Sequence, residues 1–429
     1  MKKLFLLTLT ALIATACLPQ DTQLPQSPLL PLLERKSGLI AYIGIDGNVY
    51  VTDQSGKSPT PVTDDASLPE TQTSAYRYYQ FPTWSKDGNQ IAYVGIEGTG
   101  ATQSKADLSV YNVDDETSAE IFSSETEFPF YLYWSPDNEN VSMISGNANR
   151  QSILLQNVPT AGAEPAILDT GAPYYWSWAP NGKTMIVHTG SDTTSTPEHL
   201  AFLQVDSGVI EDGLDANPAS FQAPAWSPNG ERILYPRVND EGKKELVVAD
   251  SKGEFQQTIR EFELNAAFAW SPDSELVAYI EGTENLNTAG IVGKLHVVDL
   301  ATSEDFFQTD DVLAFFWSPN SRQLAYFKPL QVTDSSGQEL SALQLNMVDA
   351  VSGESKELFP FAPTNIFSNT LQYFDQYHQS ATIWSPDSNN LLLPFVSPNG
   401  TPGIAVVAAS GQLEPRLLAE GFIGFWSWK

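Results

Sequence analysis

Cysteine is almost absent from this chain: Cys17 is the only one among 429 residues. A single cysteine cannot form a disulfide within the chain, so the fold must be held together by packing. Basic residues are also scarce, with 22 lysines and arginines against 52 acidic residues and a net charge of −30. Such a surface repels phosphate backbones and anionic lipid headgroups, which disfavours nucleic-acid binding and mainly indicates solubility.

Long apolar runs are missing as well. The run at 4–13 is too short to cross a membrane, which takes roughly 20 residues. It follows two lysines and precedes small residues, so 1–16 is predicted to be a signal peptide. Cys17 directly after it resembles the lipid-modified cysteine of a bacterial lipoprotein, although such signals usually carry Leu at the position of Ala14. An ordinary secretory cleavage that leaves Cys17 unmodified is the alternative.

The segment after this cysteine is rich in proline and glutamine and has neither helix nor strand period. That composition is typical of an extended tether. We therefore expect a lipidated cysteine and flexible tether at 17–36, followed by a single folded domain at 37–429. The expected location is a bacterial membrane, facing the periplasm or the cell exterior.

A tryptophan followed by a Ser-Pro-Asn-Gly or similar turn recurs along the chain, as in APAWSPNGERILYP at 223–236. The intervals between copies are 44 to 50 residues, with one of 67. The repeat tryptophans are Trp84, Trp134, Trp178, Trp226, Trp270, Trp317, Trp384 and Trp428. Each unit holds four strand-like runs, and this period with four strands indicates the blades of a β-propeller.

The residues around this tryptophan suggest a structural role. Ser, Pro, Asp or Asn, and Gly in succession suit a type I turn between two strands. A tryptophan before that turn can bury a large flat surface between blades, and its N–H can reach a backbone acceptor. We therefore interpret the repeat tryptophans as packing residues and the serine as a turn residue rather than a nucleophile.

The two ends of the repeat region complement each other. Residues 37–65 lack the tryptophan strand, whereas 421–429 supply only that strand. Pairing them would close the ring and remove open sheet edges. The prediction is an all-β fold, an eight-bladed propeller closed by pairing of the C-terminal strand with the N-terminal strands.

The pattern W-S-P-D-G followed by I-A-Y resembles the WD40-like (PD40) repeats of TolB-type propellers and is similar to the propeller domain of dipeptidyl peptidase IV. The resemblance covers almost the whole chain after residue 37 and implies the propeller fold. The TolB likeness also implies a protein-binding role in the cell envelope. There are two departures: TolB-type proteins have six blades after a separate small domain, and the peptidases carry a hydrolase domain after the propeller.

Motifs for catalysis are missing from the sequence. There is no G-x-S-x-G elbow, and the histidines His188, His199, His296 and His378 lie far apart without H-E-x-x-H spacing. The acidic pairs at 64–65, 114–115 and 310–311 lack the alternating spacing of calcium loops, which favours solvated turns. We predict no enzyme activity, cofactor or metal; paired carboxylates for glycoside chemistry stay open.

One repeat position divides the ring. Three residues before the repeat tryptophan, four copies carry an aromatic residue: Phe425, Phe81, Tyr131 and Tyr175. The other four carry Ala223, Ala267, Ala314 and Ala381. The aromatic rings either fill gaps between blades or form a wall beside the channel mouth, extended by Tyr78, Tyr79 and Tyr174.

The interval of 67 residues holds an aromatic insertion between Glu357 and Trp384. We expect it to cap the ring locally or to form a lid over one face. Its candidate binding residues are Tyr373, Phe374, Tyr377 and His378, the last expected at a loop surface.

These features favour a non-catalytic, membrane-tethered propeller that acts as a protein-binding scaffold in the bacterial cell envelope. The expected partner is an envelope protein, with membrane contact through the lipid only. A receptor for a small molecule, glycan or peptide at the channel mouth is the alternative. An envelope hydrolase without a recognisable motif is a second alternative, and the oligomeric state stays open.

Overall fold

The structure is a computed structural model that describes residues 38–429, apart from 70, 72, 148–152, 191–198, 212–213, 215–216, 284–289 and 334–338. The predicted signal peptide, Cys17 and the tether lie outside the described residues. In the described part of the chain, no helix is both long enough and apolar enough to cross a membrane.

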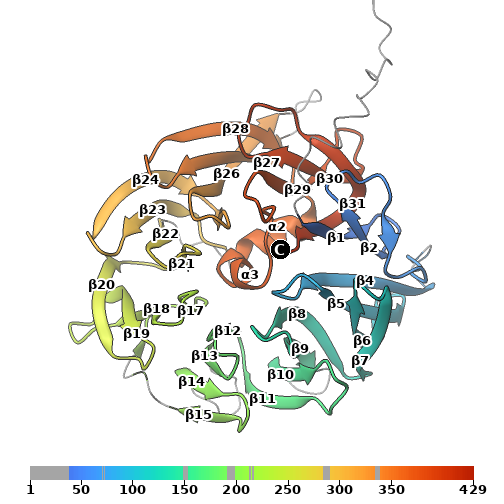
Figure 1. The fold of residues 1–429 in the computed structure, drawn as a ribbon, viewed down its shortest axis with the longest axis horizontal. Helices are drawn as coiled ribbons and strands as arrows, with labels where there is room; N and C mark the ends of the chain where they lie inside the picture. The colour runs from blue at the N-terminus through green and yellow to red at the C-terminus, as the bar shows by residue number, and fades with distance from the viewer. Residues whose placement is uncertain are drawn as a thin grey trace, which may run out of the picture. The chain divides into compact units, whose positions relative to one another are not determined.

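The described residues form seven antiparallel sheets around a central axis (Figure 1). Three consecutive sheets are formed by residues 75–211. They contain β4 (Ala75–Trp84), β5 (Gln90–Thr99), β6 (Thr102–Asn112) and β7 (Thr117–Ser124); β8 (Glu127–Trp134), β9 (Asn140–Asn147), β10 (Ile153–Pro159) and β11 (Ala166–Gly171); and β12 (Tyr174–Trp178), β13 (Thr184–Thr189), β14 (His199–Gln204) and β15 (Val209–Glu211).

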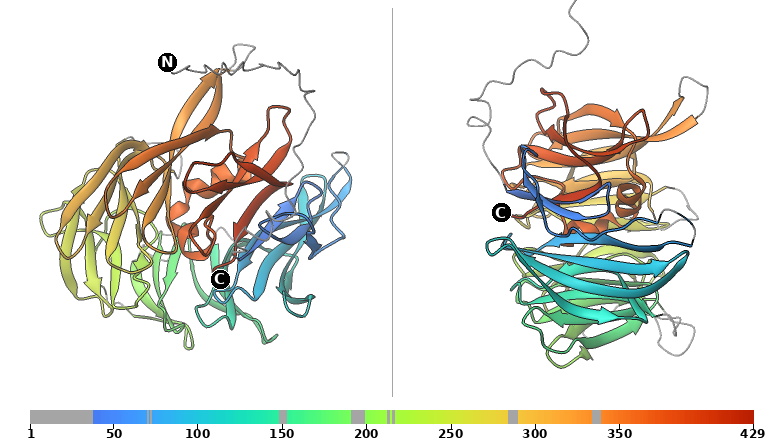
Figure 2. Two further views of the ribbon diagram at one scale, coloured as in Figure 1. Left: turned by 45° about the horizontal axis from the view of Figure 1, so that its top comes forward. Right: turned by 90° about the vertical axis from the view of Figure 1, so that its right-hand side faces the viewer.

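Three further sheets continue the ring in the same sense. They contain β16 (Asn217–Pro218), β17 (Ala225–Trp226), β18 (Arg232–Val238), β19 (Lys244–Asp250) and β20 (Phe255–Phe262); β21 (Ala266–Trp270), β22 (Leu276–Gly282), β23 (Gly293–Asp299) and β24 (Glu304–Val312); and β25 (Ala314–Trp317), β26 (Gln323–Thr333), β27 (Glu339–Asp349) and β28 (Ser355–Phe361). Strands β26 and β27 extend beyond their neighbours as a long hairpin (Figure 2).

The seventh sheet joins the two ends of the described chain. Its order is β29 (Asn390–Val396), β30 (Pro402–Ala408), β31 (Arg416–Trp426), β1 (Leu39–Gly44), β2 (Val49–Asp53) and β3 (Thr60–Pro61). Strand β31 is continuous: its first half pairs with β30 and its second half with β1. The C-terminal strand therefore closes the ring against the N-terminal strands.

The prediction of eight blades was wrong, because the described strands form a seven-bladed propeller. The sequence count assigned the first and last repeats to separate blades. In the structure, both repeats belong to the six-stranded sheet. The first half of β31 pairs with β30 of the last repeat, and its second half pairs with β1 of the first repeat.

The second strand of a blade is more buried than its outer strand. The second strand of a blade, such as β5, is buried almost throughout because neighbouring blades cover both of its faces. The outer strand β7 is largely exposed, and its sequence is accordingly polar. This explains why the repeat reads as an apolar I-A-Y-V run followed later by polar strands.

Four of the repeat tryptophans, Trp84, Trp134, Trp270 and Trp384, bond to the first strand of the preceding blade, whereas the indole N–H groups of Trp226 and Trp317 have no partner among the described residues. The indole N–H of Trp134 donates to the backbone C=O of Thr83 (2.8 Å), the residue just before Trp84. Trp270 and Trp384 make the equivalent bond to the preceding first strand, at 3.0 Å each. In these four copies the tryptophan thus combines buried area with one hydrogen bond across the blade interface.

The pairing register of β1 with β31 identifies Trp426, and not Trp428, as the last repeat tryptophan. Trp426 pairs with Ile40 as Trp84 pairs with Ile91, and Trp84 donates to the C=O of the residue before Trp426. The assignment of Trp428 as a repeat tryptophan was therefore wrong. The sequence G-F-W-S-W contains two tryptophans, and only strand pairing distinguishes them.

Candidate functional site

The long insertion forms two helices in the middle of the ring, α2 (Asn365–Gln372) and α3 (Phe374–Ser380) (Figure 1). Thr364 caps α2: its hydroxyl accepts the N–H of Phe367 (3.2 Å) and donates to the C=O of Phe422 (2.7 Å). Phe367 is buried between the rings of Phe327 and Phe361. The insertion is thus a helical plug inside the channel, neither a local cap nor a lid over a face.

Helix α3 contacts the innermost strands of four blades: β8, β12, β21 and β25. The innermost strand of each blade has one edge without a neighbour in its own sheet. Its backbone N–H and C=O groups need partners once the channel is filled. The polar residues of α3 provide them.

Gln376 is the main polar contact of the plug. Its side-chain carbonyl accepts the N–H of Trp176 (3.1 Å), and its amide donates to the C=O of the same residue (2.9 Å). The amide also donates to the hydroxyl of Tyr131 (3.1 Å), which donates to the backbone C=O of Gln376 (3.0 Å). This side chain pairs with β12 as a neighbouring strand would.

Three further residues of α3 bind other blades. Asp375 accepts the N–H of Ala223 (3.1 Å). Gln379 donates to the C=O of Pro224 (3.1 Å), and His378 Nε2 accepts the N–H of Trp317 (3.2 Å). These bonds fix the rotation of α3 about its own axis.

Burial changes the acidity of two plug residues. Desolvation raises the pKa of Asp375 to about 6, although the N–H groups of Ala223 and Gln376 act in the opposite direction. Desolvation also lowers the pKa of His378 to about 4. At neutral pH the helix therefore holds an ionised carboxylate in an unfavourable environment and a neutral imidazole.

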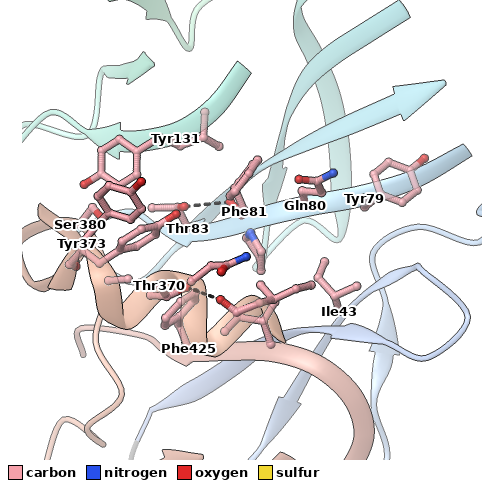
Figure 3. A pocket seen from close by; sticks show the side chains of 17 residues that line it. Ile43, Tyr79, Gln80, Phe81, Thr83, Tyr131, Thr370, Tyr373, Ser380 and Phe425 are labelled. Atoms are coloured by element: carbon pink, nitrogen blue, oxygen red, sulfur yellow. Dashed lines mark hydrogen bonds between the residues drawn. The ribbon is translucent and has the colours of Figure 1, made fainter. Parts of the chain in front are cut away.

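A pocket of about 220 Å³ remains between the plug and one side of the ring (Figure 3). Its walls come from β1, β4, β8, β31, α2 and α3 and are mostly apolar. The aromatic residues that line it are Tyr79, Phe81, Tyr131, Tyr373, Tyr377 and Phe425. Figure 3 shows that Phe81, Tyr131, Tyr373 and Phe425 come from separate parts of the chain and lie around this space. We call this space the aromatic pocket.

Phe81 has an uncommon backbone conformation at the pocket wall. Its φ is +57°, at a register shift of the β4–β5 ladder between Gln80 and Thr83. A bulky residue in the left-handed region is strained by roughly 1–2 kcal/mol. Such strain persists only where the surroundings enforce it and often occurs at functional sites.

The structure brings together part of the predicted binding surface. Tyr131 and Phe425 are buried, Phe81 and Tyr377 are half-buried, and Tyr373 is exposed, all at the aromatic pocket. Because Trp426 is the repeat tryptophan, the residue three places before it is Ile423, which also lines the pocket.

The other predicted surface residues lie elsewhere. Tyr175 stacks on Phe221 (4.8 Å), Tyr174 is buried and donates to Asp169, and Tyr78 stacks on Tyr76. Phe374 packs on Phe315, away from the pocket. His378 lies on α3 against Phe316, not at a loop surface as expected.

Sequence reasoning missed Asp375, Gln376 and Gln379. No local signal could have identified them, because their function depends on backbone edges far away in the sequence. It also missed Lys86, which occupies the proline position of the repeat turn. The replacement of proline by lysine at this position can be seen in the sequence alone.

One polar cluster has the order of a catalytic triad. His199 Nδ1 lies 2.9 Å from the hydroxyl of Thr189, and its Nε2 lies 3.3 Å from Asp169. Thr189 is fully buried in β13, so its hydroxyl cannot reach a substrate in this conformation. Within the described residues, no three His, Cys, Asp or Glu side chains are grouped to hold a metal ion.

Comparisons with known proteins identify structures but no family. No protein-family model matches the chain, and no curated protein matches it. The similar structures include an oligogalacturonate lyase in complex with manganese, which is 12% identical in sequence. The match covers 88% of this chain and 100% of that chain, with a TM-score of 0.48. A putative TolB from Agrobacterium tumefaciens has 14% identity, with 76% and 89% covered and a TM-score of 0.35.

The β-propeller domain of the Trilobed protease from Pyrococcus furiosus is also similar, with 10% identity, 80% and 96% covered, and a TM-score of 0.48. At such identities the likeness concerns the fold alone. Since a lyase, a protease domain and TolB all occur among these structures, no activity follows from them. The chain is a β-propeller, and its structural neighbours include TolB-like and lyase-like propellers.

Proposed function

We propose that the protein is a non-catalytic binding propeller that takes an apolar side chain of a protein partner into the aromatic pocket. The observation that carries this proposal is the pocket itself, an aromatic-lined space of about 220 Å³ left open beside the plug. This is smaller than the roughly 300–1,000 Å³ of typical small-molecule sites and suits a single anchoring side chain.

A photo-crosslinking amino acid at the pocket rim tests this proposal. Asn369 is exposed and lines the pocket, so a benzoylphenylalanine there should capture the partner in the native cell. The matched control places the same group at Thr117, an exposed residue on the outer strand β7. Capture at Asn369 that depends on Phe81 supports the proposal. Equal capture at both positions, or none at Asn369, contradicts it.

The proposal includes attachment to a bacterial membrane through a lipid on Cys17. It is supported by the lipoprotein-like sequence around that residue. Two or more acyl chains would anchor the protein stably, since each buried methylene contributes about 0.8 kcal/mol. Cys17→Ser should move the protein to the soluble fraction, and a variant that still sediments with membranes would rule this anchor out.

A further inference from the structure

The turn at Lys86 differs from the turns of the other repeats. Six copies place proline directly before the Asp or Asn of the turn, as Pro136 and Pro180 do, whereas the first copy has Lys86. Pro136, Pro180, Pro228 and Pro272 lie around a second cavity together with Lys86. The substitution therefore puts a cation into a ring of prolines at the end of the channel where the turns gather.

This second cavity, the lysine cavity, has a volume of about 420 Å³, within the roughly 300–1,000 Å³ of small-molecule sites. Four tryptophans line it: Trp178, Trp226, Trp270 and Trp428. Helix α3 closes its inner end with Asp375, His378 and Gln379. The cavity is separate from the aromatic pocket and suits a flat apolar body.

The Lys86 amino group is held in place but has no counter-ion among the described residues. It donates to the C=O of Gln379 near the C-terminus of α3 (2.9 Å) and lies 3.4 Å from the ring centroid of Trp428. None of the ion pairs in the described residues includes it. Burial lowers the pKa of Lys86 to about 7, as expected for a cation without a counter-ion. An ammonium has three N–H groups, so donors remain available to a ligand.

The other polar residues of α3 at this cavity are Asp375, His378 and Gln379, and the negative charge of Asp375 opposes an anion. The Nε2 of His378 accepts a backbone N–H, so the neutral ring carries its proton on Nδ1 and is a second donor. The carboxylate of Asp375 already accepts the N–H groups of Ala223 and Gln376. The negative charge of the whole protein is screened over about 8–10 Å, whereas Lys86 would act at contact.

We infer that the lysine cavity binds a small monocarboxylate with a flat apolar or aromatic body, the carboxylate on Lys86 and the body against the tryptophans. This site is independent of the protein-binding pocket proposed above, and either one can exist without the other.

Calorimetric titration of the full chain with 2-naphthoate, and with neutral 2-naphthamide as its isostere, tests the inference. Naphthoate should bind at least tenfold more tightly than the amide. Lys86→Met should abolish that difference, whereas Lys86→Arg should retain most of it. The matched control is Lys183→Met, which removes an exposed lysine from another repeat turn and should leave both affinities unchanged.

Equal affinity for the two ligands, no binding of naphthoate at millimolar concentration, or an unchanged preference in Lys86→Met would overturn the inference. If Lys86→Met does not fold, the wild-type preference and its retention in Lys86→Arg decide the question. Naphthoate should also quench the fluorescence of Trp428, and this part of the quenching should be absent in Trp428→Phe. Phe81→Gly should bind naphthoate normally, which separates this site from the aromatic pocket.

Discussion

Helix α3 meets the two halves of the ring in different ways. In the alanine half, the residue three places before the tryptophan is Ala223, Ala267, Ala314 or Ala381, and all four are buried. The strands carrying Ala267 and Ala314 contact α3 directly, and the N–H of Ala223 binds Asp375. In the aromatic half, α3 also contacts β8 and β12, but Phe81 and Tyr131 line the aromatic pocket that remains beside the helix.

The difference shows how one variable position in a repeat can create a site. A methyl group takes up little of the space between strand and helix, whereas a ring has to pack beside the helix and can leave a space next to it. The repeat itself provides the stable scaffold. The site then results from the residue three places before the tryptophan, which differs from one repeat to the next.

The largest expected effect is on the hydrogen bonds that hold α3 against β12. Gln376→Leu leaves the N–H and C=O of Trp176 without partners, each costing about 1–3 kcal/mol when buried. We expect a loss of about 3–4 kcal/mol in the free energy of unfolding, measured by chemical denaturation. Gln372→Leu is the control, because this half-buried residue makes no side-chain hydrogen bond within the described part of the chain, and it should change stability little. Equal effects of both substitutions would contradict this account.

Overpacking the alanine half tests whether the helix needs small residues there. Ala314→Phe puts a ring where α3 contacts β25 and should cost about 2–3 kcal/mol of unfolding free energy. Val351→Phe, the control, adds a similar ring at a position that is 81% exposed. A stable Ala314→Phe variant would show that α3 can move away, and that alanine does not set its position.

The raised pKa of Asp375 predicts a substitution that increases stability, in contrast to the two destabilising substitutions above, and the increase should depend on pH. Its folded pKa of about 6 lies above the ordinary value of 3.8, so its contribution to stability falls as the pH rises through this interval. Asp375→Asn should therefore stabilise the fold at pH 7.5, by about 1–2 kcal/mol once the weaker hydrogen bonding of the amide is included.

The stabilisation by Asp375→Asn should disappear at pH 4, where the wild-type carboxyl is protonated in the folded state. Thermal melting of both proteins across this range measures it. A difference that does not depend on pH would show that Asp375 does not carry the raised pKa.

The smallest expected effect on stability is at Phe81. Phe81→Gly removes the left-handed strain but loses part of the packing of a half-buried ring, so the two terms of about 1–2 kcal/mol should nearly cancel. Partner capture at Asn369 should nevertheless fall at least tenfold. A stable variant with unchanged capture would leave the aromatic pocket without a function, and large destabilisation would make Phe81 a core residue.

The sequence predicted the propeller and part of the site. It identified Phe81 and Tyr131 at a repeated position and Tyr373 and Tyr377 in the aromatic insertion, and these four residues line one pocket. It did not predict that Tyr175 would leave this group to stack on Phe221. It also read the insertion as a cap or lid, since nothing local indicates that a helix will fill a channel.

The sequence by itself determined the repeat, its strands and its turns. These depend on residues a few positions apart, such as the Ser85 hydroxyl that bonds to Asp87 and to the N–H of Gln90. Tertiary structure decided how many sheets form and where the plug lies. Gln376 binds Trp176 across 200 residues, and Ile40 pairs with Trp426 at the far end of the chain. Local chemistry fixes each turn, but an unpaired strand edge accepts whichever donor and acceptor groups the closed ring brings to it.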